Sequence, residues 1–245
     1  MEIQRRYTMQ LVLLAAGKGS RLGLNISNKC FTEIYGKCLL DYNLEMFSCF
    51  GVSKIILIVG HNAENIQKYV GTNYNGTSVT YVMQHELLGI AHAIKTAIPY
   101  IHEDFAMCLS DELFINPNIE GMRDLFLTDN VDCLCGVVQD SAENIKKAYT
   151  MDVSEIGEIL QLVEKPTQIF NQWKGTGCCL MRQTMLPVLE ALLPNKIRNE
   201  YEMGDWIQLA INMGLVCKIY PIADKNFNIN TQQDIISAEK WLQNI

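Results

Sequence analysis

The sequence predicts an α/β fold in which a doubly wound, mixed sheet carries a small antiparallel lobe. Short apolar runs alternate with helix-like segments from residue 10 to about 140, which is typical of a parallel sheet covered by helices on both faces. A glycine-rich loop directly follows the first apolar run, and two short runs around residues 156–157 have the pattern of a β-hairpin. The chain has no internal repeat or Pro/Ser-rich linker, which favours a single domain over residues 1–245.

Each element of the first half has its own local signal. Residues 10–16 (QLVLLAA) form an apolar run that ends in small residues, and residues 54–60 (KIILIVG) form a β-branched run closed by glycine, so both are predicted strands. Residues 39–50 place leucine and phenylalanine at helical spacing, and a helix at 90–98 stops at Pro99. The remaining predictions for this half are strands at 78–83 and 105–109 and a helix at 63–70.

The second half predicts a different arrangement. The hairpin joins two strands around Ile156 and Gly157, because glycine suits the turn between them. Its strands are expected at 149–153 and 158–163, followed by helices at 183–193 and 205–213, a strand at 215–219 and a closing helix at 232–243.

The composition is that of an ordinary globular protein. With 49% hydrophobic and 19% charged residues, the 245-residue chain can bury a core, so a mainly disordered state is excluded. No apolar run approaches the roughly 18 residues that span a membrane, and residues 1–10 lack the apolar stretch of a signal peptide. We therefore expect a cytoplasmic protein that does not associate with membranes. The net charge of −7 argues against nucleic-acid binding, and a homo-oligomer is left open.

The nine cysteines do not form a recognisable metal or redox motif. Cys133 and Cys135 are two residues apart and Cys178 and Cys179 are adjacent, and neither spacing is typical of zinc or redox sites. We interpret the cysteines as small buried hydrophobic residues in a reducing compartment.

The strongest local signal is the loop after the first predicted strand. The segment from Leu14 to Leu22 reads LAAGKGSRL, so Gly17 and Gly19 allow a tight turn whose backbone amides can approach phosphate oxygens, and Arg21 adds a positive charge. The spacing matches neither the P-loop nor the dinucleotide-binding fingerprint. An ordinary glycine-rich turn stays open at this point, and so does a phosphate-binding role for Lys29.

Asp111 follows the predicted strand at 105–109. In open α/β sheets, ligands bind outside the carboxyl ends of the strands, and a carboxylate there is well placed to hold Mg²⁺ beside phosphates. The alternative is that Asp111 caps a following helix, since aspartate is a favoured N-cap.

Gln84 ends the predicted strand at 78–83. Its amide offers one acceptor and two donors, which matches the hydrogen-bonding edge of uracil or thymine. A polar residue at the end of a strand is the simpler interpretation.

Two further polar segments lie in the second half. Glu164 and Lys165 precede Pro166, so they could form a surface ion pair or offer a carboxylate to hydroxyls and an ammonium to a phosphate. Asn228 and Asn230 precede the last helix, where either could bind a metal or cap that helix in competition with the adjacent threonine.

Taken together, these segments resemble the sugar-1-phosphate nucleotidyltransferases, also called NDP-sugar pyrophosphorylases, from about residue 10 to 243. The segments that carry the resemblance are LAAGKGSRL, NKCFTEIYGKCLLDYNLEMF, Gln84 with GIAHAI, LSDELF, VEKP, GTGCCLM, NEYEMGDWIQLAINMG and FNINTQQDI. The resemblance implies a Rossmann-like fold of the nucleotide-diphospho-sugar transferase type. It places a nucleotide-binding half at 10–140 and an acceptor-binding half at 141–245. It also implies the reaction, in which a pyrimidine NTP and a sugar 1-phosphate give an NDP-sugar and pyrophosphate.

The resemblance further implies a role for each matching residue. It implies catalytic roles for Arg21, Lys29 and Lys165. The residues that it implies for nucleotide binding are Leu14, Ala15, Ala16, Gly17, Gly19, Ser20, Gln84 and Gly89. Acceptor binding falls to Glu164, Lys165, Gly177 and Thr150, and Mg²⁺ binding falls to Asp111 with Asn228 or Asn230.

Several positions depart from the family pattern. Asn28 replaces the usual proline before Lys29, and Thr150 stands where many members have a glycine that faces the sugar. Asn228 and Asn230 stand where many members have aspartate. Three rivals stay open: a CTP-dependent cytidylyltransferase for phosphocholine or a phosphonate, a non-catalytic regulatory paralogue, and a nucleotide-binding α/β domain of other chemistry. Gln84 and the VEKP segment favour a sugar acceptor with UTP or dTTP.

Overall fold

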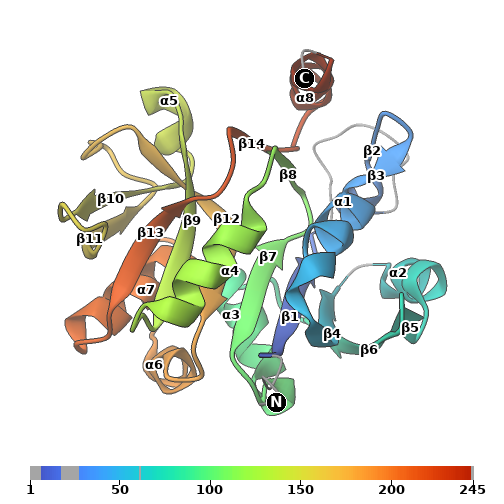
Figure 1. The fold of residues 1–245 in the computed structure, drawn as a ribbon, viewed down its shortest axis with the longest axis horizontal. Helices are drawn as coiled ribbons and strands as arrows, with labels where there is room; N and C mark the ends of the chain where they lie inside the picture. The colour runs from blue at the N-terminus through green and yellow to red at the C-terminus, as the bar shows by residue number, and fades with distance from the viewer. Residues whose placement is uncertain (1–6, 18–27, 61, 244–245) are drawn as a thin grey trace, which may run out of the picture.

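The centre of the computed structural model, which describes residues 7–17, 28–60 and 62–243, is an eight-stranded mixed sheet (Figure 1). Its strands are β1 (Met9–Ala15), β4 (Val52–Val59), β5 (Asn73–Tyr74), β6 (Thr77–Met83), β7 (Phe105–Leu109), β9 (Cys133–Gln139), β12 (Trp173–Met181) and β13 (Cys217–Pro221). They are arranged in the order β13-β9-β12-β7-β1-β4-β6-β5. Strand β1 pairs in parallel with β4 and β7, whereas β12 runs antiparallel between β7 and β9. The predicted mixed sheet is therefore confirmed.

Helices cover both faces of this sheet because the side chains of its central strands are apolar on both sides. In β1, Leu11 and Leu13 belong to one apolar cluster, and Val12 and Leu14 belong to another. The first cluster includes side chains of α1 (Leu39–Met46), α2 (Ala63–Val70) and α4 (Ile119–Thr128). The second includes side chains of α3 (Ile90–Ala97), α6 (Met185–Ala191) and α7 (Met203–Asn212). Figure 1 shows α1 and α4 in front of the strands.

Smaller elements surround the sheet. The hairpin of β10 (Tyr149–Val153) and β11 (Ile159–Glu164) is antiparallel, as predicted, and β8 (Glu112–Ile115) pairs with β14 (Lys225–Asn228). The remaining elements are β2 (Glu33–Ile34), β3 (Lys37–Cys38), α5 (Ala142–Ile145), α8 (Gln232–Leu242) and the 3₁₀ turns Lys29–Phe31, Ser48–Phe50 and Ile98–Tyr100. The β8–β14 pair places Asn228 opposite Glu112 and thereby brings the end of β14 beside Asp111.

The predicted strands and helices of both halves are present, with shifted ends. The helix expected at 39–50 ends at Met46, and a 3₁₀ turn and Gly51 (φ 64°) complete the segment. The strand expected at 215–219 is Cys217–Pro221, and the helix expected at 183–193 is Met185–Ala191. Strand β12 has no predicted counterpart among the apolar runs of the sequence, because Gly175 and Gly177 are not typical of a strand interior.

The cysteines are buried, as expected. All nine are free thiols, and only Cys49 is partly exposed. The sulfur atoms of Cys133, Cys135 and Cys179 lie within 4.8 Å of one another inside the apolar core. Sequence spacing cannot show this cluster because Cys179 comes from the neighbouring strand β12.

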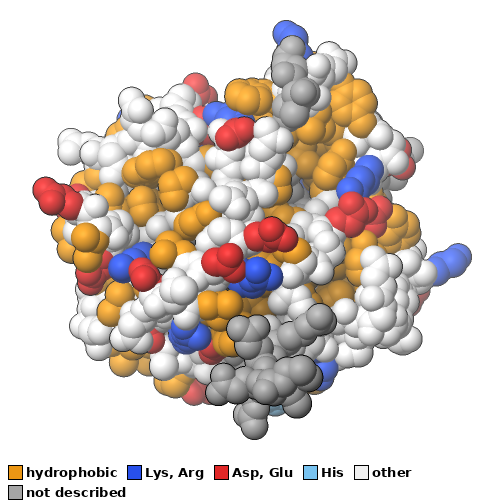
Figure 2. Space-filling model, viewed as in Figure 1, with side chains coloured by type: hydrophobic (Ala, Val, Ile, Leu, Met, Phe, Trp, Pro, Cys, Tyr) orange, Lys and Arg blue, Asp and Glu red, His pale blue; other side chains and the backbone are white. Residues whose placement is uncertain are grey.

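The exterior is mixed in character. Figure 2 shows acidic, basic and hydrophobic side chains interspersed on one face of the molecule. Among the described residues, no helix has the length and apolar character needed to cross a bilayer.

Candidate active site

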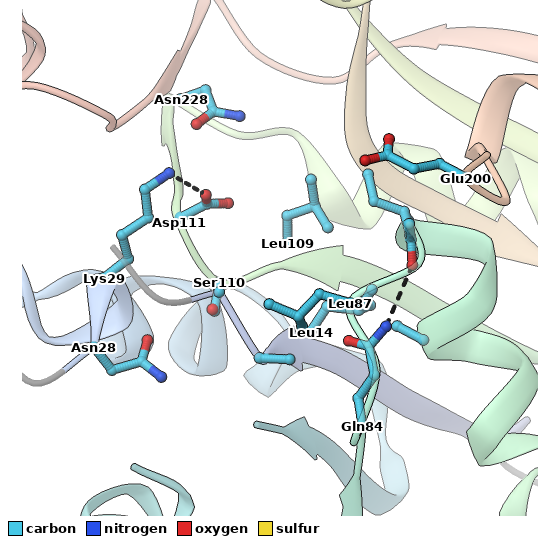
Figure 3. A pocket seen from close by; sticks show the side chains of 15 residues that line it. Leu14, Asn28, Lys29, Gln84, Leu87, Leu109, Ser110, Asp111, Glu200 and Asn228 are labelled. Atoms are coloured by element: carbon cyan, nitrogen blue, oxygen red, sulfur yellow. Dashed lines mark hydrogen bonds and ion pairs between the residues drawn. The ribbon is translucent and has the colours of Figure 1, made fainter. Parts of the chain in front are cut away.

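The carboxyl ends of the parallel strands meet at one edge of the sheet. There β1 leads to Ala16 and Gly17, β6 leads to Gln84, and β7 leads to Asp111. These residues line a cavity with a volume of ≈ 440 Å³ (Figure 3). Its lining also includes Leu14, Asn28, Lys29, Leu87, Gly89, Ile90, Ala93, Leu109, Ser110, Glu200 and Asn228. The cavity therefore draws on both halves of the chain, at the edge where open α/β sheets bind ligands.

Lys29 joins two of the predicted metal-binding residues. Its Nζ lies 2.8 Å from Asp111 Oδ2 and also donates to Asn230 Oδ1 (Figure 3 shows the first contact). The Asn230 Nδ2 group donates to Asn228 Oδ1 at 2.6 Å, which orients the Asn230 oxygen toward the cation. A carboxylate and an amide oxygen thus converge on one positive charge, and such oxygen ligands suit Mg²⁺.

The alternative capping roles are wrong for Asp111 and for the two asparagines. Strand β8, not a helix, follows Asp111. The last helix is capped by Thr231, whose side chain accepts from the Asp234 amide while Asp234 accepts from the Thr231 amide. The polar side chains of Asp111, Asn228 and Asn230 are therefore not used as helix caps.

Asn28 lines the cavity and has a structural role that the sequence did not predict. Its Nδ2 donates to the Ala15 carbonyl at 2.9 Å, and its Oδ1 accepts from the Cys30 amide at 3.2 Å. Asn28 is the N-cap of the 3₁₀ turn that contains Lys29, so it ties this lysine to the end of β1. The strong N-cap preference of asparagine was the signal available in the sequence.

Gln84 is 5% exposed and lines the cavity. Its Nε2 lies 3.4 Å from the Gly89 carbonyl and 3.3 Å from His92 Nδ1. Gly89 has a φ of 106°, and a Cβ atom there would lie 2.4 Å from the Tyr201 carbonyl oxygen. Only glycine fits at this position, where the Gln84 side of the cavity packs against the second half of the chain.

Lys165 lies at the end of β11 in the left-handed region (φ 46°), which ends the strand before Pro166, as predicted. Its Nζ lies 2.9 Å from Glu202 Oε1 and 4.0 Å from Glu200 Oε2. Glu202 is buried and also binds Arg198 at 2.6 Å. Although burial opposes it, the hydrogen bonds from Lys165 and Arg198 lower the pKa of Glu202. Lys165 is thus held beside Glu200, which lines the cavity.

Glu164 lies near the same charged groups as Lys165 but makes a different contact. Its Oε2 accepts from the Gly204 amide at 3.2 Å, at the start of α7. Burial raises the pKa of Glu164 to about 7, and the nearby charge of Glu202 adds to this effect.

Gly177 and Thr150 occupy packed positions. A Cβ atom at Gly177 would lie 2.3 Å from Leu109 Cγ, and the Gly177 amide donates to Glu112 Oε2 at 3.0 Å. Thr150 is fully buried, and its Oγ1 accepts from the Phe170 amide at 3.3 Å. Neither residue lines the cavity described above.

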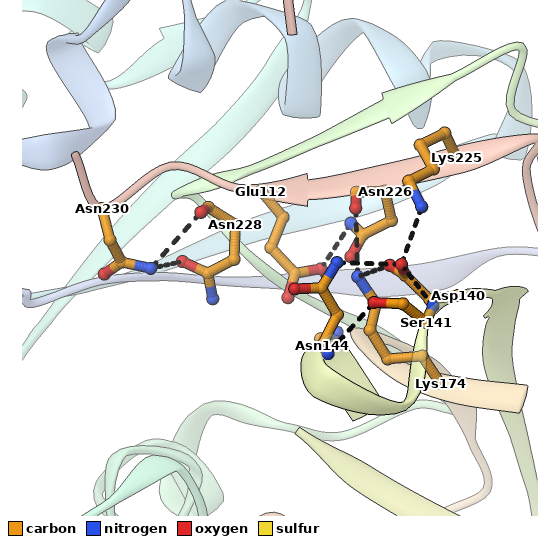
Figure 4. Close-up of polar contacts among 10 residues, drawn as sticks. Glu112, Asp140, Ser141, Asn144, Lys174, Lys225, Asn226, Asn228 and Asn230 are labelled. Carbon is orange, nitrogen blue, oxygen red and sulfur yellow. Dashed lines mark hydrogen bonds and ion pairs between the residues drawn. The ribbon is translucent and has the colours of Figure 1, made fainter. Parts of the chain in front are cut away.

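Glu112 belongs to a buried polar network next to Asp111. Besides the Gly177 amide it accepts from Asn226 Nδ2 at 3.0 Å (Figure 4). Burial raises the pKa of Glu112 to about 7, and the charge of Asp111 adds to the shift. Asp140 lies close to this network, where it binds Lys174 at 3.0 Å and Lys225 at 2.8 Å.

A second cavity, of ≈ 540 Å³, adjoins the first at Asn228, which lines both. Its lining residues include Asn144, Lys147, Lys174, Gly175, Lys225, Asn226, Asn230, Gln233 and Asp234. Amide groups and paired lysines give this cavity a polar wall beside Asn228 and Asn230.

Only some of the predicted nucleotide-binding residues lie in the part of the chain that the structure describes. Gly19, Ser20 and Arg21 lie outside the described residues. Ala15 is buried on the opposite side of β1 from the cavity, where its carbonyl receives Asn28. Glu200 was not singled out as a site residue, because only tertiary packing brings it to the cavity.

The high pKa of Glu164 gives a prediction about stability. The folded protein holds a proton on Glu164 up to about pH 7, whereas the unfolded chain releases it near 4.5, so the free energy of unfolding falls as the pH rises through this window. We expect Glu164→Gln, which keeps an oxygen for the Gly204 amide, to reduce that fall by about 2 kcal/mol. Urea unfolding at pH 4.5 and pH 7.5 measures it. Glu112 contributes a similar fall to wild type and to the variant. If the difference in unfolding free energy between the two pH values were the same in wild type and in Glu164→Gln, Glu164 would not have the raised pKa.

Comparison with known proteins identifies the family. The family described as Nucleotidyl transferase matches residues 10–236. This chain belongs to that family. The resemblance drawn from the sequence motifs is thereby confirmed, and the protein is a nucleotidyltransferase.

Two curated relatives cover nearly the whole chain. The UTP–glucose-1-phosphate uridylyltransferase AglF of Haloferax volcanii is 29% identical over 237 residues, which are 96% of this chain and 97% of AglF. The bifunctional protein GlmU of Methanococcus maripaludis is 28% identical over 245 residues, which are 96% of this chain and 55% of GlmU. This chain therefore spans nearly the full length of one relative and about half of the other.

Solved structures agree with the fold. A UDP-glucose pyrophosphorylase complexed with UDP-glucose has a TM-score of 0.86 at 21% identity and covers 97% of this chain and 99% of its own. A putative glucose-1-phosphate thymidylyltransferase from Bacillus anthracis has a TM-score of 0.85 at 18% identity, over 98% of this chain and 96% of its own. These likenesses confirm the Rossmann-like nucleotidyltransferase fold.

Proposed function

We propose that this protein transfers a nucleoside monophosphate from UTP or dTTP to a sugar 1-phosphate and releases pyrophosphate. The observation that carries the proposal is a single cavity that joins the Gln84 carboxamide, the Lys29–Asp111 pair and Glu200 beside Lys165. AglF, whose name states the use of UTP and glucose 1-phosphate, supports the choice of substrates.

The reaction requires alignment of the two substrates and neutralisation of the charge on their phosphates. A phosphate oxygen of the acceptor attacks the α-phosphorus of the NTP, and the bond between that phosphorus and the pyrophosphate oxygen breaks. The attacking oxygen is already an anion, so no general base is required. Cations near the reacting phosphates then supply most of the catalytic effect.

We assign the phosphate-binding roles to three cations. Lys29 lies beside the end of β1, where the loop that contains Arg21 begins, and we assign both residues to the phosphates of the NTP. Lys165 would hold the acceptor phosphate, and Glu164 would accept a sugar hydroxyl in place of the Gly204 amide. The first half, residues 10–140, would bind the nucleotide, and residues 141–245 would bind the acceptor.

Mg²⁺ is part of the proposal. Asp111 and Asn230 would hold it, since their oxygens already face one cation, and Asn228 would orient Asn230. When bound, Mg²⁺ neutralises charge on the phosphates of the NTP. Lys29, released from Asp111, would then be available to a phosphate oxygen.

A substrate panel tests the proposed function. UTP, dTTP, CTP, ATP and GTP are each combined with glucose 1-phosphate, N-acetylglucosamine 1-phosphate and phosphocholine, and pyrophosphate release is measured with and without Mg²⁺. We expect release with UTP or dTTP and a sugar phosphate. Pyrophosphate release only from the combination of CTP with phosphocholine would indicate a cytidylyltransferase. No release in any combination would indicate a non-catalytic regulatory paralogue.

Gln84 gives a prediction within this panel. Because its carboxamide is buried and faces the cavity, Gln84→Ala leaves a polar edge of the base without a partner. We expect kcat/KM for UTP or dTTP to fall by a factor that corresponds to a loss of about 1–3 kcal/mol of transition-state stabilisation. The matched control is Gln233→Ala, which changes the second cavity instead. Equal kinetics of the Gln84 variant and wild type would remove Gln84 from base recognition.

A further inference from the structure

The orientation of the Gln84 carboxamide is determined by its neighbours. The Gly89 carbonyl, 3.4 Å away, can only accept a hydrogen bond, so the nitrogen of the amide must face it. Figure 3 shows this contact, with the amide oxygen on the opposite side. The same nitrogen lies 3.3 Å from His92 Nδ1. Because an amide nitrogen only donates, His92 Nδ1 is the acceptor in this contact.

These two contacts use both hydrogens of the Gln84 amide. One hydrogen is directed at Gly89 and the other at His92, so the group that Gln84 can offer to a ligand is its oxygen, an acceptor. Gln84 is 5% exposed, and a reversed amide would place its oxygen against the Gly89 carbonyl. The reversed orientation is therefore disfavoured as long as both neighbours stay in place.

His92 is itself held in place. It lies in the first turn of α3, and its ring packs on the Tyr201 ring with 5.8 Å between the centroids. Tyr201 is tied to the same region by its backbone, since its amide donates to Leu88 at 2.7 Å and its carbonyl accepts from Ala91 at 3.0 Å. The second half of the chain thus supports the acceptor that orients Gln84.

An amide oxygen distinguishes the pyrimidines from one another. Uracil and thymine carry a hydrogen on N3, which can be donated to this oxygen. Cytosine carries a lone pair at N3 and its donor hydrogens on N4. An oxygen that faces N3 therefore accepts a hydrogen bond from uracil or thymine but meets a lone pair of cytosine. Cytosine would be accommodated if the amide were reversed.

We propose that His92 is a positioning residue that selects uracil or thymine over cytosine by fixing the Gln84 carboxamide with its oxygen toward the base. The proposal rests on the proposed function, since it assigns the nucleotide base to the Gln84 side of the cavity. It goes further by explaining which pyrimidine is chosen and by which contact.

The test compares UTP and CTP binding by calorimetry in the presence of Mg²⁺, without any acceptor. Wild type is expected to bind UTP at least about 10-fold more tightly than CTP, the worth of one polar contact. In His92→Leu, which removes the acceptor, the ratio of the two dissociation constants is expected to fall about 10-fold. In His92→Asn, which restores an acceptor close to the position of Nδ1, the ratio is expected to recover.

The ratio separates positioning from a general structural role. A loss of packing alone weakens UTP and CTP equally and leaves the ratio unchanged, which would overturn the proposal. Equal binding of UTP and CTP by wild type, or failure of His92→Asn to restore the ratio, would also overturn it. Failure of wild type to bind UTP, dTTP or CTP would instead contradict the proposed function.

Discussion

Asp111→Asn is expected to lower kcat about 100-fold or more at saturating Mg²⁺, because one well-placed electrostatic group is worth that much in a phosphoryl transfer site. Asp111 lies two residues after the end of β7, lines the cavity and lies 2.8 Å from Lys29 Nζ. Asparagine keeps the shape of the side chain and removes its charge, so the loss measures the charge. The Mg²⁺ concentration required for half-maximal activity is expected to rise as well.

Asp129→Asn is the matched control for this experiment. Asp129 also binds a lysine, Lys218, at 2.9 Å, but it lines neither cavity. We expect turnover near that of wild type in this control. If Asp111→Asn matched the control in both turnover and Mg²⁺ requirement, Asp111 would not be a metal ligand.

Lys165→Ala is expected to lower kcat/KM for every phosphorylated acceptor about 10- to 100-fold, the cost of losing a hydrogen bond from a charged group. Lys165 has Glu202 at 2.9 Å and Glu200 at 4.0 Å, so its ammonium is positioned where the second half meets the cavity. The KM for the NTP is expected to change little, since the nucleotide is assigned to the other half.

Lys218→Ala removes a lysine of another ion pair and controls for the loss of charge. The substitution is not expected to leave Glu202 unpaired, because Glu202 keeps Arg198 as a partner in the Lys165→Ala variant. A variant that uses sugar 1-phosphates as well as wild type would show that another group holds the acceptor phosphate.

The site residues that could be predicted from sequence are those at strand ends. Asp111 and Gln84 each follow an apolar run, and parallel strands bring their carboxyl ends to one edge, so their meeting at a cavity was foreseeable. Lys29 and Asn230 are 201 positions apart, and their hydrogen bond depends on the pairing of β8 with β14. That pairing has no local signal, since both strands are four residues long.

Strand β12 shows the same limit for the fold. Gly175 and Gly177 weaken its strand pattern, yet a Cβ atom at these positions would lie 2.0 Å from the Tyr149 ring and 2.3 Å from Leu109. The glycines are required by neighbours from other strands, and this requirement cannot be recognised along the chain.

The sequence by itself determined the α/β class, the positions of half of the fourteen strands and of most helices in the described residues, and the family. These follow from periodicity and from short motifs, which are properties of neighbouring residues. Only the tertiary structure decided that Lys29 bridges Asp111 and Asn230, that Glu164 faces the Gly204 amide rather than the cavity, and that His92 faces Gln84. The physical reason is that hydrogen bonds act over about 3 Å, and which side chains come that close depends on how distant segments pack.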